Sequence, residues 1–232
     1  MEIAQMIKSI DTVISTVKPI VEIVAPKLQG LMKSFADRMI ELSKEYPSIA
    51  EFAKMVDTAA DIMGDVLHVL GINSDPADVM GAKIVQADKK SDEFDTIQAY
   101  IEYLKNEVEL DKEKFDALST EEKVAYGIVG MAVEANAIGE KLGVEISADV
   151  VEMAAKIAGI GKIAVEAKEV ISVISNLKDE GISNLNDLCD CIKGSGNSDR
   201  LKTGKIFLKI LDILSPNEGK NIFNEIIDEV RK

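Results

Sequence analysis

Apolar residues recur at intervals of three and four through the first part of the chain, which is the spacing of one face of an α-helix. The series runs from Ile3 to Phe35 and alternates as a heptad repeat does. Met6, Val13 and Ile20 widen the stripe on one flank. A stripe of this width suits a bundle helix better than a two-stranded coiled coil. The first part of the chain is therefore expected to be helical, with its stripe packed in the core or against a partner.

Pro19 and Pro26 interrupt this stripe. A proline inside a helix costs about 3 kcal/mol unless the helix kinks or restarts there. Both prolines lie off the stripe, so a kinked helix would keep its apolar face. We expect one helix to end near residue 17 and the next to run from about residue 20 or 26 to about residue 45.

Local start and stop signals mark the helices in the rest of the chain. Ser48 and Ser119 are each followed three residues later by a glutamate, as in a capping box. Asp75 and Pro76 suit an N-cap followed by proline at the first helical position. No run alternates apolar and polar residues as a half-buried strand would. The sequence predicts helices near 2–17, 20–45, 49–70, 76–88, 92–109, 112–118, 120–142, 148–178, 184–193, 199–214 and 217–231.

These signals predict an all-α fold, a multi-helix bundle of about 9–11 helices without a β-sheet. The 232 residues are enough for a sizeable core. We expect a single helical domain over 1–232, with two lobes, 1–118 and 119–232, as the alternative. Segments 120–142 and 148–178 should be the most buried, because both are rich in small residues. A glycine inside a helix costs about 1 kcal/mol relative to alanine, so their glycines are expected to allow close packing.

The charge balance excludes several classes of ligand. The net charge is −14, from 41 acidic and 27 basic residues, and a charge of this sign repels nucleic acid and anionic lipid. Tryptophan is absent, and few aromatic residues remain on which bases could stack. No run is long and apolar enough to span a bilayer. We expect no nucleic-acid binding and no stable membrane insertion.

Cysteine and histidine, the residues most often used for metal and redox chemistry, are scarce. Cys189 and Cys191 stand one residue apart, too close for an unstrained bridge and too few for a disulfide framework. Together with a start that lacks the basic region of a secretory signal, this predicts a cytoplasmic protein without a cofactor. His68 is the one histidine and is expected near a helix C-terminus, where the helix dipole favours it.

Two pairs of acidic residues suggest an enzymatic alternative. Glu166 and Glu169 are three residues apart, as are Asp187 and Asp190, so each pair would share a helical face. Four converging carboxylates could hold Mg²⁺ for attack on a phosphate anhydride. Over about 25 residues the pattern resembles that of the all-α nucleotide pyrophosphohydrolases, which have glutamate where this chain has Asp187. The resemblance implies a magnesium-dependent hydrolase.

The primary functional hypothesis is a soluble helical protein–protein interaction module of adaptor, inhibitor, immunity or regulatory type, without catalytic chemistry. Long apolar helix faces are abundant in the sequence, whereas catalytic residue types are scarce. The partner would be another protein or a second copy. A membrane-active, toxin-like protein is the second alternative, suggested by the small-residue segment 120–178. A basic cluster is the candidate partner-binding site: Lys193, Arg200, Lys202, Lys205 and Lys209.

Overall fold

The computed structural model describes residues 17–24, 27–28, 30–159 and 165–179, with single residues 15, 161, 181, 185, 189, 210 and 213. These residues contain helices and no strand, which confirms the all-α class. The elements with complete bounds are α2 (Leu31–Ser43), α3 (Ile49–Val69), α4 (Ala77–Gln86), the 3-10 helix η1 (Ser91–Glu93), α5 (Ile97–Glu107), α6 (Lys112–Asp116), α7 (Thr120–Leu142), α8 (Ala148–Gly159) and α9 (Ala167–Asp179).

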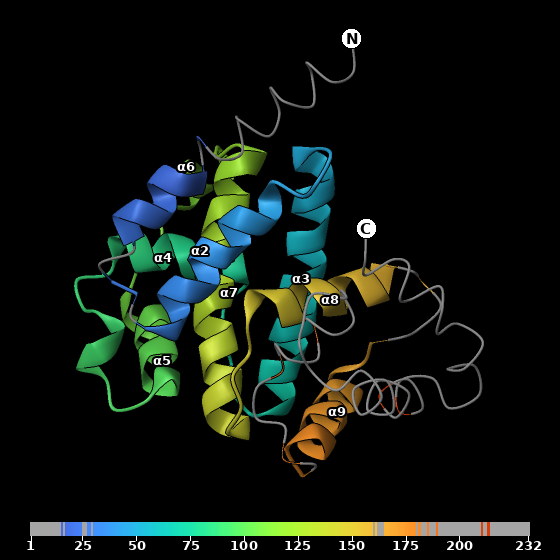
Figure 1. Ribbon diagram of the computed structural model, residues 1–232. Helices are drawn as coiled ribbons and strands as arrows, with labels where there is room; N and C mark the ends of the chain where they lie inside the picture. The colour runs from blue at the N-terminus through green and yellow to red at the C-terminus, as the bar shows by residue number, and fades with distance from the viewer. Residues whose placement is uncertain are drawn as a thin grey trace.

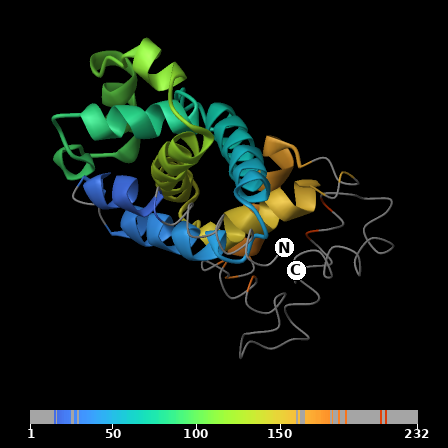
Figure 2. The same ribbon diagram turned by 90° about the horizontal axis from the view of Figure 1, so that it is seen from above.

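Helix α7 is the central element, and α2, α3, α4 and α5 all contact it (Figures 1 and 2). It begins at the predicted capping box, in which the Ser119 hydroxyl accepts from the Glu122 N–H and the Glu122 carboxylate accepts from the Ser119 N–H. It ends before Gly143, whose φ of 67° lies in the left-handed region that favours glycine. Both ends of α7 are therefore set by local sequence, as expected.

Glycines allow α4 to cross α7 at very short range. A Cβ added to Gly130 would overlap the backbone carbonyl of Ala77, and one added to Gly81 would overlap that of Tyr126. The predicted packing role of the α7 glycines is thus confirmed at Gly130. Helix α8 packs across α3, so the two long helices α3 and α7 each carry a shorter helix across them (Figure 1).

The N-terminal stripe enters the core, but its helix breaks later than expected. Residues 17–24 are helical, so the chain passes Pro19 without a break. The predicted helix end near residue 17 is therefore wrong, and so is an unbroken helix over 20–45. The chain instead turns before α2, where Gly30 has a φ of 50°. The turn changes the helical phase, and Leu31 is 53% exposed as a result. The described stripe residues before the turn are buried: Val17, Val21, Val24 and Leu28.

The predicted helix 148–178 is also wrong, because the structure divides it into α8 and α9. Gly161, between them, has a φ of 70°, which a right-handed helix does not contain. A Cβ on Gly159 would meet nothing within 4 Å, so this glycine is not required for close packing. The predicted helices 2–17, 184–193, 199–214 and 217–231 lie mostly outside the described residues.

Two helix starts are shifted from their predicted positions. The N-cap of α4 is Pro76, not Asp75, and the Asp75 carboxylate lies 2.8 Å from the Lys83 ammonium. The predicted helix 92–109 begins only at Ile97, after η1, because the Thr96 hydroxyl accepts from the Ala99 N–H and caps α5 there.

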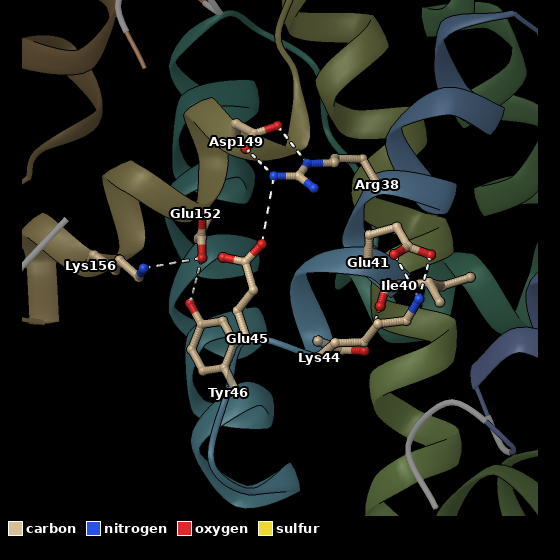
Figure 3. A network of polar contacts seen from close by, with 10 residues as sticks. Arg38, Ile40, Glu41, Lys44, Glu45, Tyr46, Asp149, Glu152 and Lys156 are labelled. Carbon is tan, nitrogen blue, oxygen red and sulfur yellow. Dashed lines mark hydrogen bonds and ion pairs between the residues drawn. The ribbon is translucent and has the colours of Figure 1, made fainter. Parts of the chain in front are cut away.

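A polar network joins α2 and the residues after it to α8 (Figure 3). Arg38 donates to both Asp149 oxygens, at 2.9 and 2.8 Å. The fully buried Glu152 carboxylate accepts from the Tyr46 hydroxyl at 3.2 Å and lies 3.2 Å from the Lys156 ammonium. Burial raises the pKa of Tyr46, and the neighbouring Glu152 charge raises it further. Tyr46 therefore stays a hydrogen-bond donor.

The buried side chains form two clusters. The larger contains residues from Val17 to Ala155, on both sides of the 118/119 division. The single domain over 1–232 and its two-lobe alternative both stay predictions. The smaller lies between α8 and α9 and includes the buried Cys189, whose sulfur is 3.9 Å from that of Met153. Across the residues described, no helix combines the length and apolarity needed to cross a membrane.

Candidate functional site

A cleft of about 590 Å³ lies where α3, the start of α4 and α7 meet. Its outer side is acidic. Helix α3 contributes Asp57, Asp61 and Asp65, which are four residues apart and therefore share one helical face. Asp75, just before α4, and Asp78, in the first turn of α4, join them. The cleft thus presents several carboxylates to solvent along two turns of one helix.

The three aspartates of α3, here called the aspartate row, are exposed. They form no ion pair or side-chain hydrogen bond with any residue that the structure describes. The pKa of Asp57 is raised by partial burial and by the negative charges of Asp61 and Asp78. A bound cation would relieve the repulsion between Asp57 and these two neighbours.

Glu134 of α7 also lines the cleft, but from its buried side. The residue is 1% exposed, and its Oε2 atom has no hydrogen-bond partner among the described residues. Burial raises the pKa of this carboxyl to about 8. A buried polar atom without a partner costs free energy, and such groups are concentrated at functional sites. Glu134 is therefore the strongest indication that the cleft binds a ligand.

Gly64 keeps part of the cleft wall open. It lies inside α3, where glycine costs about 1 kcal/mol relative to alanine. A Cβ at this position would meet nothing within 4 Å, in contrast to Gly81 and Gly130. Close helix packing therefore does not explain Gly64, and its missing side chain leaves space in the cleft.

The cleft does not have the geometry of a metal centre. Within the described ranges, no three His, Cys, Asp or Glu residues lie close enough together to hold one metal ion. Successive members of the aspartate row are one helical turn apart, about 6 Å along the axis. That spacing matches a ligand with several separate positive charges better than a single ion.

The other two large hollows lack a buried acid, and most of their charged groups are paired; the exception among the described residues is Glu145, an exposed residue that lines both of them. A second hollow of about 560 Å³, between α2 and α7, contains Glu140, whose carboxylate accepts from the Ile97 N–H at 3.0 Å. A third, of about 360 Å³, contains the Arg38–Asp149 pair. Of these three hollows, the acidic cleft is the one that combines carboxylates lacking partners with a buried acid.

Of the site residues predicted from sequence, the structure describes Glu166 and Glu169, and neither lines the acidic cleft. Glu166 is exposed and directly precedes α9, and Glu169 lies in the first turn of that helix. Asp187 and Asp190 lie outside the described residues, so the four-carboxylate magnesium site stays a prediction. The whole basic cluster, Lys193, Arg200, Lys202, Lys205 and Lys209, also lies outside them. His68 is exposed in the last turn of α3, as predicted, and lines the acidic cleft.

Sequence reasoning missed the aspartate row and Glu134, although both leave a signal. The row repeats one residue type at the helical interval of four. Glu134 is the one charged residue between Lys123 and Glu140, in a stretch of apolar and small residues. A lone acid in a segment predicted to be buried is the pattern that could have identified it.

Comparisons of the chain with protein-family models, with curated proteins and with solved structures found no match.

Proposed function

We propose that this chain is a protein-binding module whose acidic cleft takes a basic segment of a partner protein. The proposal rests on the aspartate row, three carboxylates that span about 12 Å of α3 and have no partner among the residues described. A helical peptide segment with basic side chains one turn apart offers positive charges at comparable intervals. Glu134 behind the row supports a bound group that reaches into the cleft.

The charge of the whole chain supports the same class of partner. A net charge of −14 accelerates the approach of a basic protein and opposes that of nucleic acid. We propose an adaptor, inhibitor, immunity or regulatory role without catalytic chemistry. We also propose a cytoplasmic location, since two cysteines one residue apart suit a reducing compartment.

The test uses a fluorescent alanine-based peptide with lysines one helical turn apart, with binding followed by anisotropy. The cleft variant carries Asp57→Asn, Asp61→Asn and Asp65→Asn. The control variant carries Asp88→Asn, Glu109→Gln and Asp116→Asn, which remove the same charge from exposed positions outside the cleft lining. We expect the cleft variant to bind about tenfold more weakly, because three exposed charge pairs are each worth up to about 1 kcal/mol. The control variant should stay within about twofold of wild type, because it loses only long-range attraction.

Three outcomes would contradict the proposal. Equal losses in the two variants would mean that the peptide responds only to overall charge. Spermidine that binds as tightly as the peptide would identify a small polyamine as the ligand. Tighter binding of a peptide with the sequence of residues 193–209 would point to self-association through the basic cluster.

A further inference from the structure

We infer that Glu134 is the receptor for one primary ammonium group, a lysine side chain of the basic segment that reaches into the cleft between α3 and α7. The inference rests on the proposed function and deepens it. The aspartate row would attract the segment, whereas Glu134 would hold one of its side chains.

The walls of the cleft suit the aliphatic part of a lysine side chain. Residues from α3 and α7 form these walls with apolar or very small side chains. Lysine commonly packs its methylene groups on such surfaces while its ammonium finds a polar partner. The wall residues in question are Val56, Ala60, Gly64, Val124 and Gly127.

The chemistry of Glu134 favours an ammonium over a guanidinium group. An arginine brings five N–H donors that are fixed in a plane, whereas a lysine ammonium brings three. Glu134 offers one carboxyl group, and it is 1% exposed, so little water is present to satisfy extra donors. Each buried donor left without an acceptor costs about 1–3 kcal/mol. The ammonium therefore leaves fewer buried donors unsatisfied.

Binding should release a proton from the cleft. Because burial raises the pKa of Glu134 to about 8, its carboxyl group is mostly protonated near pH 7 in the empty protein. An ammonium group beside it favours the carboxylate, so the carboxyl proton leaves to solvent while the lysine keeps its charge. The other charged and titratable side chains that face the cleft are Asp57, Asp61, Asp65 and His68 from α3, Asp75 and Asp78 before and in α4, and Lys123 from α7.

Calorimetric titration in two buffers of different ionisation enthalpy counts the protons released. The probe is the same lysine peptide, with an arginine version and an acetyl-lysine version as matched comparisons. For wild type near pH 7 we expect release of close to one proton per lysine peptide, and affinity at least about tenfold above that for the arginine peptide. Glu134→Gln, which mimics the protonated acid, should bind the lysine peptide at least about tenfold more weakly and release no proton.

Gly64→Leu provides a second variant that leaves Glu134 in place. A side chain at Gly64 would occupy cleft space without a clash at Cβ, so this variant should fold and also lose proton release. Unchanged affinity and proton release in both variants would overturn the inference, and so would equal binding of the lysine and arginine peptides. The proposed function fails separately, if Asp57→Asn, Asp61→Asn and Asp65→Asn together leave the affinity of the lysine peptide unchanged.

Discussion

Glu134 makes the stability of the empty protein depend on pH. In the unfolded chain its pKa is that of an ordinary glutamate, whereas burial raises it to about 8 in the folded protein. Between these two values the folded state holds a proton that the unfolded state has lost. The free energy of unfolding therefore falls as pH rises through this interval, by up to about 1.4 kcal/mol per pH unit from this one residue.

Glu134→Gln should remove that dependence, because glutamine does not titrate. Urea unfolding of wild type and Glu134→Gln from about pH 5 to pH 8 isolates the effect as the difference between the two proteins. Over this range, the free energy of unfolding of the variant should rise by a few kcal/mol relative to that of wild type. Parallel curves would mean that the Glu134 carboxyl is ionised in the folded protein.

Gly64 and Gly130 lie in long helices but should respond to alanine in opposite directions. Gly64→Ala adds a methyl group where nothing lies within 4 Å, so it should stabilise the protein by about 0.5–1 kcal/mol. Gly130→Ala places the methyl group on the Ala77 carbonyl and should destabilise it by about 1–3 kcal/mol or more. Urea midpoints measure both changes. A destabilised Gly64→Ala variant would show that this glycine serves packing and not the cleft.

At the scale of the element, α4 fixes one side of the cleft and is held at both ends. Its start crosses α7 at Gly130, so the segment with Asp75 and Asp78 is fixed relative to α3 and α7. Its end is held by the Lys27 ammonium, which donates to the carbonyls of Ile84, Val85 and Ala87 at 3.2, 2.7 and 2.6 Å. The last carbonyls of a helix lack an i+4 N–H partner within it, and a positive charge there also suits the helix dipole. The Ile84 carbonyl also accepts from the Ala87 N–H, at 3.3 Å.

Lys27→Met should therefore destabilise the protein, since it keeps the aliphatic stem and removes the ammonium. We expect a loss of about 1–3 kcal/mol in the free energy of unfolding, measured by urea denaturation. Lys33→Met is the control, because its exposed ammonium lies 3.8 Å from Asp37 and should contribute less than about 1 kcal/mol. Equal losses in the free energy of unfolding would mean that the Lys27 contacts at the end of α4 stabilise the protein no more than an exposed ion pair does.

Helix starts and ends could be predicted from sequence where short-range contacts determine them, as at Ser48 and Ser119. The division of 148–178 could not, because glycine both allows close packing and permits a positive φ. Gly130 allows close packing and Gly161 adopts a positive φ, and only the tertiary structure distinguishes these two roles. The cleft could not be predicted either, since it depends on how α3, α4 and α7 cross.

At the scale of the whole molecule, some acidic side chains are neutralised by basic neighbours and others are left to attract a ligand. Many acidic side chains are already paired, as in the Arg38–Asp149 contact, whereas the aspartate row has no partner in the part of the chain that the structure describes. The row therefore combines the field of a strongly acidic chain with a local site that a basic segment could occupy. Association should be steered electrostatically.

The rate of association with the lysine peptide should consequently fall steeply with salt. Stopped-flow fluorescence between low and physiological ionic strength should show an on-rate that drops about tenfold or more, because screening shortens the reach of the charges. The dissociation rate should change much less. An on-rate that is independent of salt would contradict electrostatic steering by the acidic protein.

The most direct test of the binding account is to observe the Glu134 side chain during binding. Carbon-13 NMR of protein labelled at glutamate carboxyl carbons, with Glu134→Gln to assign the signal, reports whether this acid is protonated. Near pH 6.5, we predict a protonated signal in the free protein that moves to the carboxylate position as the lysine peptide is added. A Glu134 signal that stays protonated at saturating peptide, or that is ionised before peptide is added, would contradict the account.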